Sequence, residues 1–168
     1  RWKVDRRLPA KDDGPDAYST PIVAGNELLI AGSDHVNSYD LLSGKQNWIT
    51  SGLTIDSPYG RVIASPVPTP SGIVIAASAN PGGGGKGRVI AVNALGKKGN
   101  VSSNRAWTQE KSSPDSSTPV AVNGLAFMLA DSGIVTCADV KTGKVKYTKR
   151  LSKGPYHASL VAGDDKVY

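Results

Sequence analysis

Cysteine is nearly absent from this chain, and this absence sets the first limits on its chemistry. Cys137 is the single cysteine among 168 residues, so no disulfide can form within the chain. The compartment stays open on this ground, because a secreted domain with an adequate hydrophobic core needs no disulfide. There is also no run of about 18 apolar residues and no signal-peptide pattern, so we expect no membrane span.

Residues that carry catalysis or bind metals are also few. His35 and His157 are the only histidines, and no Cys or carboxylate near them has a spacing that indicates zinc. Glu27 and Glu110 are the only glutamates, and no closely spaced acidic group suggests an oxygen cage for calcium. The glycine-rich run 81–87 lacks the first Gly and the final Ser/Thr of a phosphate-binding loop, so we interpret it as a flexible insertion. We therefore name no catalytic residue and no metal ligand.

Positive charge, in contrast, is in excess, with a formal net charge of +6. It is concentrated in residues 1–11 and 141–153. A basic surface can bind nucleic acid or another anionic polymer, and steep salt dependence would reveal such binding. Lysines also protect exposed sheet edges from aggregation, and we prefer this interpretation. A nucleic-acid partner is therefore not expected.

Glycine and proline are abundant, with 19 Gly and 11 Pro. Both residues interrupt helices, and no stretch of about ten residues has a helical hydrophobic period. The chain is therefore predicted to be all-β, with short strands joined by tight turns.

One sequence unit recurs along the chain. The unit begins with Ser or Thr, usually followed by Pro, and continues with an apolar run. A Gly turn leads to a second apolar run, and a third run ends in Asp or Asn. A Gly-Lys turn and a fourth strand with an aromatic residue complete the unit. Equivalent positions, at steps of 45, 53 and 41 residues, are Pro21, Pro66, Pro119 and Leu160. Four short strands in a repeat of this length are typical of a four-stranded antiparallel β-propeller blade.

The pattern Asp-x-x-Ser/Thr-Gly-Lys-x-x-Trp/Tyr, found at 40–48 and 139–147, resembles the pyrroloquinoline-quinone-like (PQQ-like) propeller repeat. Quinoprotein dehydrogenases contain this repeat, as do non-enzymatic bacterial relatives such as the outer-membrane assembly lipoprotein, to which the chain is more similar. The resemblance covers residues 19–168. It implies that an aromatic residue docks between adjacent blades and that a Gly turn lets it approach. The residues that match these structural roles are Trp48, Trp107, Tyr147, Gly44 and Gly143, together with Asp40 and Asp139, whose carboxylates we expect to bind turn amides.

We expect a single partial propeller domain over residues 1–168, with about three and a half blades out of a ring of seven or eight. Its expected parts are the last strand of a preceding blade at 1–4, blades at 18–50, 62–109 and 117–151, and the start of a further blade at 157–168. Open blade faces are apolar, so self-association is expected.

The segments that lead into the innermost strands of a propeller converge on its central funnel. In this chain they provide aromatic, cationic and acidic groups, and convergent polar groups in a concave site are typical of ligand binding. The candidate binding residues are Asp16, Tyr18, Tyr59, Arg61, Asp115, Tyr156 and His157.

The leading hypothesis is a non-catalytic propeller that acts as a binding scaffold for a protein partner or a small ligand. By resemblance it is bacterial and periplasmic or secreted, and it needs no cofactor. The alternative is a fragment of a dehydrogenase that depends on pyrroloquinoline quinone and calcium. The resemblance implies that alcohol-oxidising dehydrogenases of this family carry a disulfide between adjacent cysteines. This chain has a single cysteine and cannot form that disulfide, which weakens the dehydrogenase alternative.

Overall fold

The computed structural model describes residues 1–6, 18–54, 61–79 and 86–168 and consists of strands with one short 3₁₀ helix. The first sheet contains β1 (Ile22–Ala24), β2 (Glu27–Gly32), β3 (His35–Asp40) and β4 (Gln46–Thr50). The second contains β5 (Val67–Pro68), β6 (Ile73–Ala79), β7 (Lys86–Asn93) and β9 (Arg105–Lys111). The third contains β10 (Val120–Val122), β11 (Leu125–Leu129), β12 (Ile134–Asp139) and β13 (Val145–Arg150), and a hairpin of β14 (Ala162–Gly163) and β15 (Lys166–Val167) follows.

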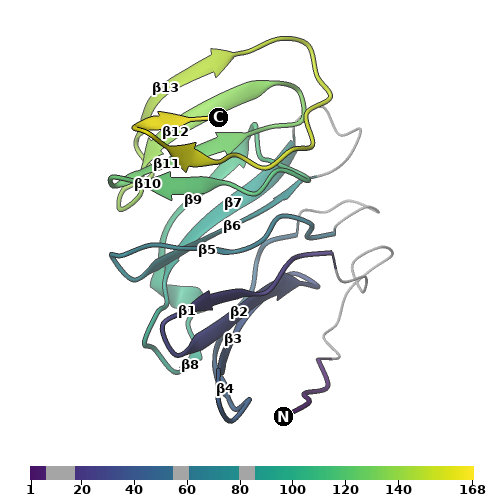
Figure 1. The fold of residues 1–168 in the computed structure, drawn as a ribbon, viewed down its shortest axis with the longest axis vertical. Helices are drawn as coiled ribbons and strands as arrows, with labels where there is room; N and C mark the ends of the chain where they lie inside the picture. The colour runs from purple at the N-terminus through teal and green to yellow at the C-terminus, as the bar shows by residue number, and fades with distance from the viewer. Residues whose placement is uncertain (7–17, 55–60, 80–85) are drawn as a thin grey trace.

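The three sheets share one topology and lie one after another along the molecule (Figure 1). In each sheet, consecutive strands pair antiparallel in the order of the chain, as tight turns between short strands require. The all-β prediction is confirmed, and the arrangement is that of a partial β-propeller with four-stranded antiparallel blades. Among the described residues, no helix is long and apolar enough to cross a membrane.

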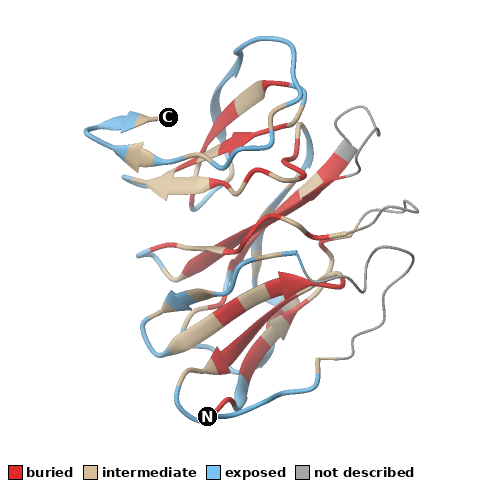
Figure 2. Cartoon of the chain, turned by 45° about the vertical axis from the view of Figure 1, so that its right-hand side comes forward, coloured by how far each residue is buried: buried red, intermediate tan, exposed pale blue. Residues whose placement is uncertain are grey.

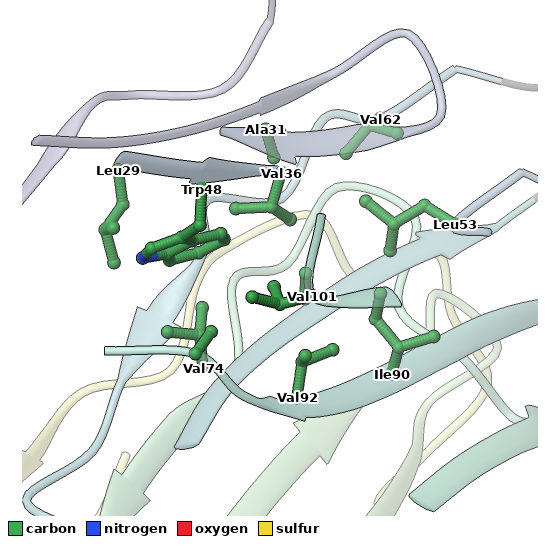
Figure 3. Close-up of a cluster of buried hydrophobic side chains, with 12 residues drawn as sticks. Leu29, Ala31, Val36, Trp48, Leu53, Val62, Val74, Ile90, Val92 and Val101 are labelled. Carbon is green, nitrogen blue, oxygen red and sulfur yellow. The ribbon is translucent and has the colours of Figure 1, made fainter. Parts of the chain in front are cut away.

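Apolar side chains from neighbouring sheets meet in two core clusters. The first lies between the first and second sheets, where Trp48 packs with Val74 and Val92 (Figure 3). The second joins the second and third sheets and includes Ile75 and Met128. Each blade therefore buries its apolar faces against its neighbours, which stabilises the stack by the hydrophobic effect.

Burial is greatest in the middle sheet (Figure 2). All seven residues of β6 are buried, because this strand has a paired strand on each side and a blade on each face. The apolar first runs of the repeat suit inner strands between neighbouring blades, yet β1, β5 and β10 are short and mostly intermediate in exposure. Each of these strands pairs on one side only, so part of its surface stays open.

The connection between β7 and β9 leaves its own blade. Residues Gly99–Asn100 form β8, which pairs in parallel with β4 at the outer edge of the first sheet. The 3₁₀ helix η1 (Ser102–Asn104) then leads back to β9. The first sheet therefore has five strands, and this extra strand was not predicted.

Two expected segments differ from the structure in detail. Lys86 and Gly87, placed in a flexible insertion by the sequence, belong to β7, where Gly87 pairs with Ala79. The rest of that insertion lies outside the described residues. Residues 1–4, expected as a last blade strand, form no strand, because a strand needs a ladder and none of the described strands pairs with them.

Candidate functional site

The repeated Ser/Thr before each first strand forms a chain of hydrogen bonds across the blades. The Thr20 N–H donates to Ser65 Oγ at 3.0 Å, and the Ser65 N–H donates to Thr118 Oγ1 at 3.1 Å. The Thr118 N–H in turn donates to Ser159 Oγ at 3.1 Å. This hydroxyl relay, made of Thr20, Ser65, Thr118 and Ser159, connects residues 45, 53 and 41 positions apart. It explains why each unit repeats a hydroxyl residue, and it holds the segments that lead into the first strands side by side.

Four of the predicted binding residues lie just before this relay and interact across blades. The Arg61 guanidinium lies over the Tyr18 ring, 5.7 Å from its centroid. Its Nη2 is 3.5 Å from Asp115 Oδ2. His157 joins the group through a further residue, Asp131, whose Oδ2 is 3.2 Å from His157 Nδ1.

Asp131, which the sequence analysis did not single out, connects two of the segments. Its Oδ1 accepts a hydrogen bond from the Asp115 N–H at 3.2 Å, and its carbonyl accepts one from the Tyr156 N–H at 3.0 Å. It lies in the turn between β11 and β12. A signal was present, because the matching turn of the first sheet carries Asp34, whose carboxylate accepts hydrogen bonds from the Gly52 and Thr54 amides.

Burial and charge act in opposite directions on Asp115, which is 4% exposed. Desolvation raises the pKa of this carboxyl, and nearby Asp131 raises it further, whereas Arg61 and His157 lower it. Asp115 Oδ1 and Ser117 Oγ are buried without a hydrogen-bond partner among the described residues. Buried polar atoms are usually hydrogen-bonded, so these two are exceptions close to the Arg61–Asp115 contact.

The remaining predicted residues have other places. Tyr156 packs its ring against Gly133, and its hydroxyl forms a hydrogen bond with the Ser152 hydroxyl, so it ties the end of the third sheet to the following segment. Asp16 and Tyr59 lie outside the described residues. The candidate site is therefore the funnel group of Tyr18, Arg61, Asp115, Asp131 and His157.

The aromatic residues with predicted docking roles pack against the following blade where one is present. The Trp107 ring lies against Gly143, and its Nε1 donates to the Val140 carbonyl at 2.8 Å. Trp48 is fully buried, and its Nε1 donates at 2.7 Å to Glu27, whose other oxygen accepts from the Gly96 N–H at 2.7 Å. Glu27 thus joins the first and second sheets, a role that the sequence analysis missed.

The two ends of the stack differ from its middle. Gly44, the counterpart of Gly143, is covered by the ring of Trp2, whose Nε1 donates to the Leu41 carbonyl at 3.1 Å. Residues 1–4 therefore place an aromatic ring where a preceding blade would place one. Tyr147 at the other end is 50% exposed.

The Asp residues of the repeat cap the turns that the aromatic residues approach. Asp40 Oδ1 accepts hydrogen bonds from the Ser43 amide and hydroxyl at 2.8 and 2.7 Å. Asp139 Oδ1 accepts the same pair from Thr142, both at 2.9 Å. These bonds favour the ionised form and lower the pKa of both carboxyls.

The donor set of the funnel group does not suit a calcium ion. Asp115 and Asp131 provide oxygens, but the Arg61 guanidinium already faces Asp115 and would repel a cation. Among the described residues, no group of three or more His, Cys, Asp or Glu side chains is arranged to hold a metal. The funnel group therefore does not fit a calcium ion.

Stacked four-stranded blades, docked by aromatic residues onto glycine turns, define a β-propeller of the PQQ-like repeat class. The chain belongs to the family of outer membrane protein assembly factor BamB, whose sequence profile matches residues 1–168. No curated protein matches the chain.

Solved structures share this fold at low sequence identity. BamB from Moraxella catarrhalis superposes with a TM-score of 0.65 at 17% identity, over 89% of this chain and 39% of that one. The computationally designed Ika8 protein gives 0.63 at 13% identity, over 88% of this chain and 40% of that one. The designed Ika4 protein gives 0.65 at 13%, over 98% and 91%. This chain therefore spans about two fifths of the first two proteins.

Proposed function

We infer that this chain is part of a non-catalytic propeller scaffold that binds a protein partner during outer membrane protein assembly in a bacterium. The family match over residues 1–168 carries this proposal, since the family is that of an outer membrane protein assembly factor. The periplasm is the compartment that this role requires.

The structure supports a binding role through the funnel group. It presents an aromatic ring, a guanidinium, two carboxylates and an imidazole from separate blades, and the hydroxyl relay fixes the backbone beneath them. Tyr18 and His157 are the most exposed members, with 44% of Tyr18 and 63% of the His157 side chain accessible. A partner can therefore contact these two residues without unfolding a blade.

The test is complementation in the source bacterium. The gene for the full protein is deleted, and folded outer-membrane β-barrels are quantified by their heat-modifiable migration on gels. We expect the deletion to reduce the folded fraction and the intact gene to restore it. We expect the Tyr18→Ala/His157→Ala variant to fail in restoration, whereas Leu42→Ala, at an 82% exposed turn residue, restores it. An unchanged folded fraction after deletion would overturn the proposed role.

The dehydrogenase alternative has its own readout. Pyrroloquinoline quinone absorbs visible light, so we expect its spectrum to stay unchanged when it is mixed with the purified protein and Ca²⁺. A spectral change, together with quinone-dependent dye reduction, would replace the scaffold proposal by the enzyme. Fractionation of cells that express the full protein tests the periplasmic location separately.

A further inference from the structure

The outer edge of the first sheet is covered by a strand from another part of the chain. β8 pairs in parallel with β4 and matches Trp48 with Gly99. The next residue, Val101, donates its N–H to the Ile49 carbonyl at 2.9 Å and buries its side chain between the first two sheets (Figure 3). This covering segment thus combines a backbone ladder on an outer strand with an apolar side chain between neighbouring blades.

The second sheet has an equivalent outer strand without such a cover. β9 pairs with β7 and is the last strand of its sheet, with no second neighbour among the described strands. An open groove of about 640 Å³ lies between β9 and the third sheet. Its lining residues are Thr108, Gln109, Glu110, Lys111, Ser112, Thr136, Val145 and Thr148. This β9 groove is the counterpart, one blade along, of the space that Val101 fills.

The charges at the β9 groove favour an acidic occupant. Glu110 is paired with Arg88 at 3.0 Å, so its negative charge is offset. Lys111 lines the groove, and Val145 and Thr148 of β13 form part of the opposite wall. All of β13 is exposed, so its Lys146, Lys149 and Arg150 add positive charge to the surface around the groove without lining it. Lysines at a free edge disfavour a neutral or basic strand, whereas they attract a strand that carries carboxylates.

We propose that the β9 groove binds an extended acidic segment of a partner protein, which adds to β9 as β8 adds to β4. Backbone hydrogen bonds to the free edge hold the segment, and one small apolar side chain enters the groove beside Val145. Lys111 in the groove and the basic surface of β13 around it select acidic sequences. The groove lies on outer strands and shares no residue with the funnel group, so this inference does not depend on the proposed function.

Two labelled peptides test the proposal with the intact chain. The probe is a fluorescein-labelled peptide of alternating Thr and Glu with a central Val, and the matched peptide carries Lys in place of each Glu. Fluorescence anisotropy is expected to show the acidic peptide binding at least about tenfold more tightly, with affinity that falls as salt rises. Hydrogen exchange of the unlabelled complex is expected to slow at the backbone amides of residues 108–112.

Charge variants locate the binding surface. Lys111→Glu/Lys146→Glu is expected to weaken the acidic peptide about tenfold or more. The control Lys45→Glu/Lys97→Glu makes the same charge change at exposed lysines elsewhere and is expected to keep wild-type affinity. Equal binding of the two peptides, no binding of either, or binding without protection of residues 108–112 would each overturn the proposal. The exchange readout uses the wild-type chain, so it stands even if a variant fails to fold.

Discussion

Trp107 shows how one side chain joins two blades. Its ring lies against Gly143, which has a φ of 70°, and a Cβ added at Gly143 would come within 2.6 Å of the ring. Alanine at this position would therefore strain the turn and also displace the indole. We expect Gly143→Ala to lower the free energy of unfolding by about 2–4 kcal/mol, measured by urea denaturation.

Gly124 provides the matched control for that prediction. It has a φ of 76°, but an added Cβ would meet no atom within 4 Å. Gly124→Ala is therefore expected to cost only the backbone strain, about 1 kcal/mol. If both variants lost the same free energy of unfolding, the contact between the Trp107 ring and Gly143 would not require a residue without a side chain at this position.

Asp139 gives a pH dependence whose sign follows from its hydrogen bonds. These bonds, with the Thr142 amide the largest cause, lower the pKa of Asp139 from its ordinary value of 3.8. As pH falls, the unfolded chain takes up this proton first, so the stabilisation by Asp139 is present above about pH 4 and is lost through the folded pKa. We expect Asp139→Asn to be less stable than the wild type at neutral pH and equal to it in strong acid.

Urea midpoints measured across this acidic range check the Asp139 prediction. Asp40→Asn repeats the test in the first sheet, because the Ser43 hydroxyl and amide lower the pKa of Asp40 in the same way. A stability difference that stays constant with pH would mean that the carboxylate charge is not what stabilises the turn.

At the scale of the element, β8 shows that a connection can take over the role of a blade strand. Val101, which follows it, is 2% exposed in the core between the first two sheets. We expect Val101→Ala to cost about 1–3 kcal/mol of unfolding free energy, through lost burial and the cavity that remains. Hydrogen exchange at the backbone amides of β4 should also become faster, because the ladder from β8 loosens.

Val161→Ala is the control for Val101→Ala, since Val161 is 62% exposed and its truncation should change stability by less than about 0.5 kcal/mol. If Val101→Ala changed the free energy of unfolding as little as Val161→Ala, the covering segment would lie on the first sheet without contributing to the stability of its core. Faster exchange at β4 without a change in stability would place the effect in local opening alone.

At the scale of the whole molecule, the third sheet and the hairpin after it expose apolar side chains. The exposed large apolar residues at this end are Val145, Tyr147, Leu151, Val161 and Tyr168. Exposed apolar area of this kind favours association, so we expect light scattering to give an apparent mass that rises with protein concentration. Leu151→Glu/Val161→Glu should shift the chain toward the monomer. A monomeric mass at all concentrations would contradict this prediction.

Across the whole molecule, the sequence predicts local features well and contacts between distant residues poorly. The repeats, the strands and the aromatic-to-glycine units are local patterns, so they are visible without a structure. The funnel residues Tyr18, Arg61, Asp115 and His157 were grouped from the propeller geometry alone. The repeated turn Asp, Asp34 and Asp131, was visible in the sequence, but only the structure places Asp131 between Asp115 and His157. Glu27 was missed because its partners Trp48 and Gly96 are 21 and 69 residues away in the sequence.

The sequence by itself determined the class of fold, since a strand needs only its own period of apolar residues and a turn needs only its own Gly or Asp. The tertiary structure alone decided which residues meet across blades. Thr20, Ser65, Thr118 and Ser159 look like separate turn residues in the sequence and become one hydrogen-bonded relay only when the blades stack. The placement of β8 on the first sheet has the same origin, because an exposed outer strand offers its ladder to whichever segment the packing brings beside it.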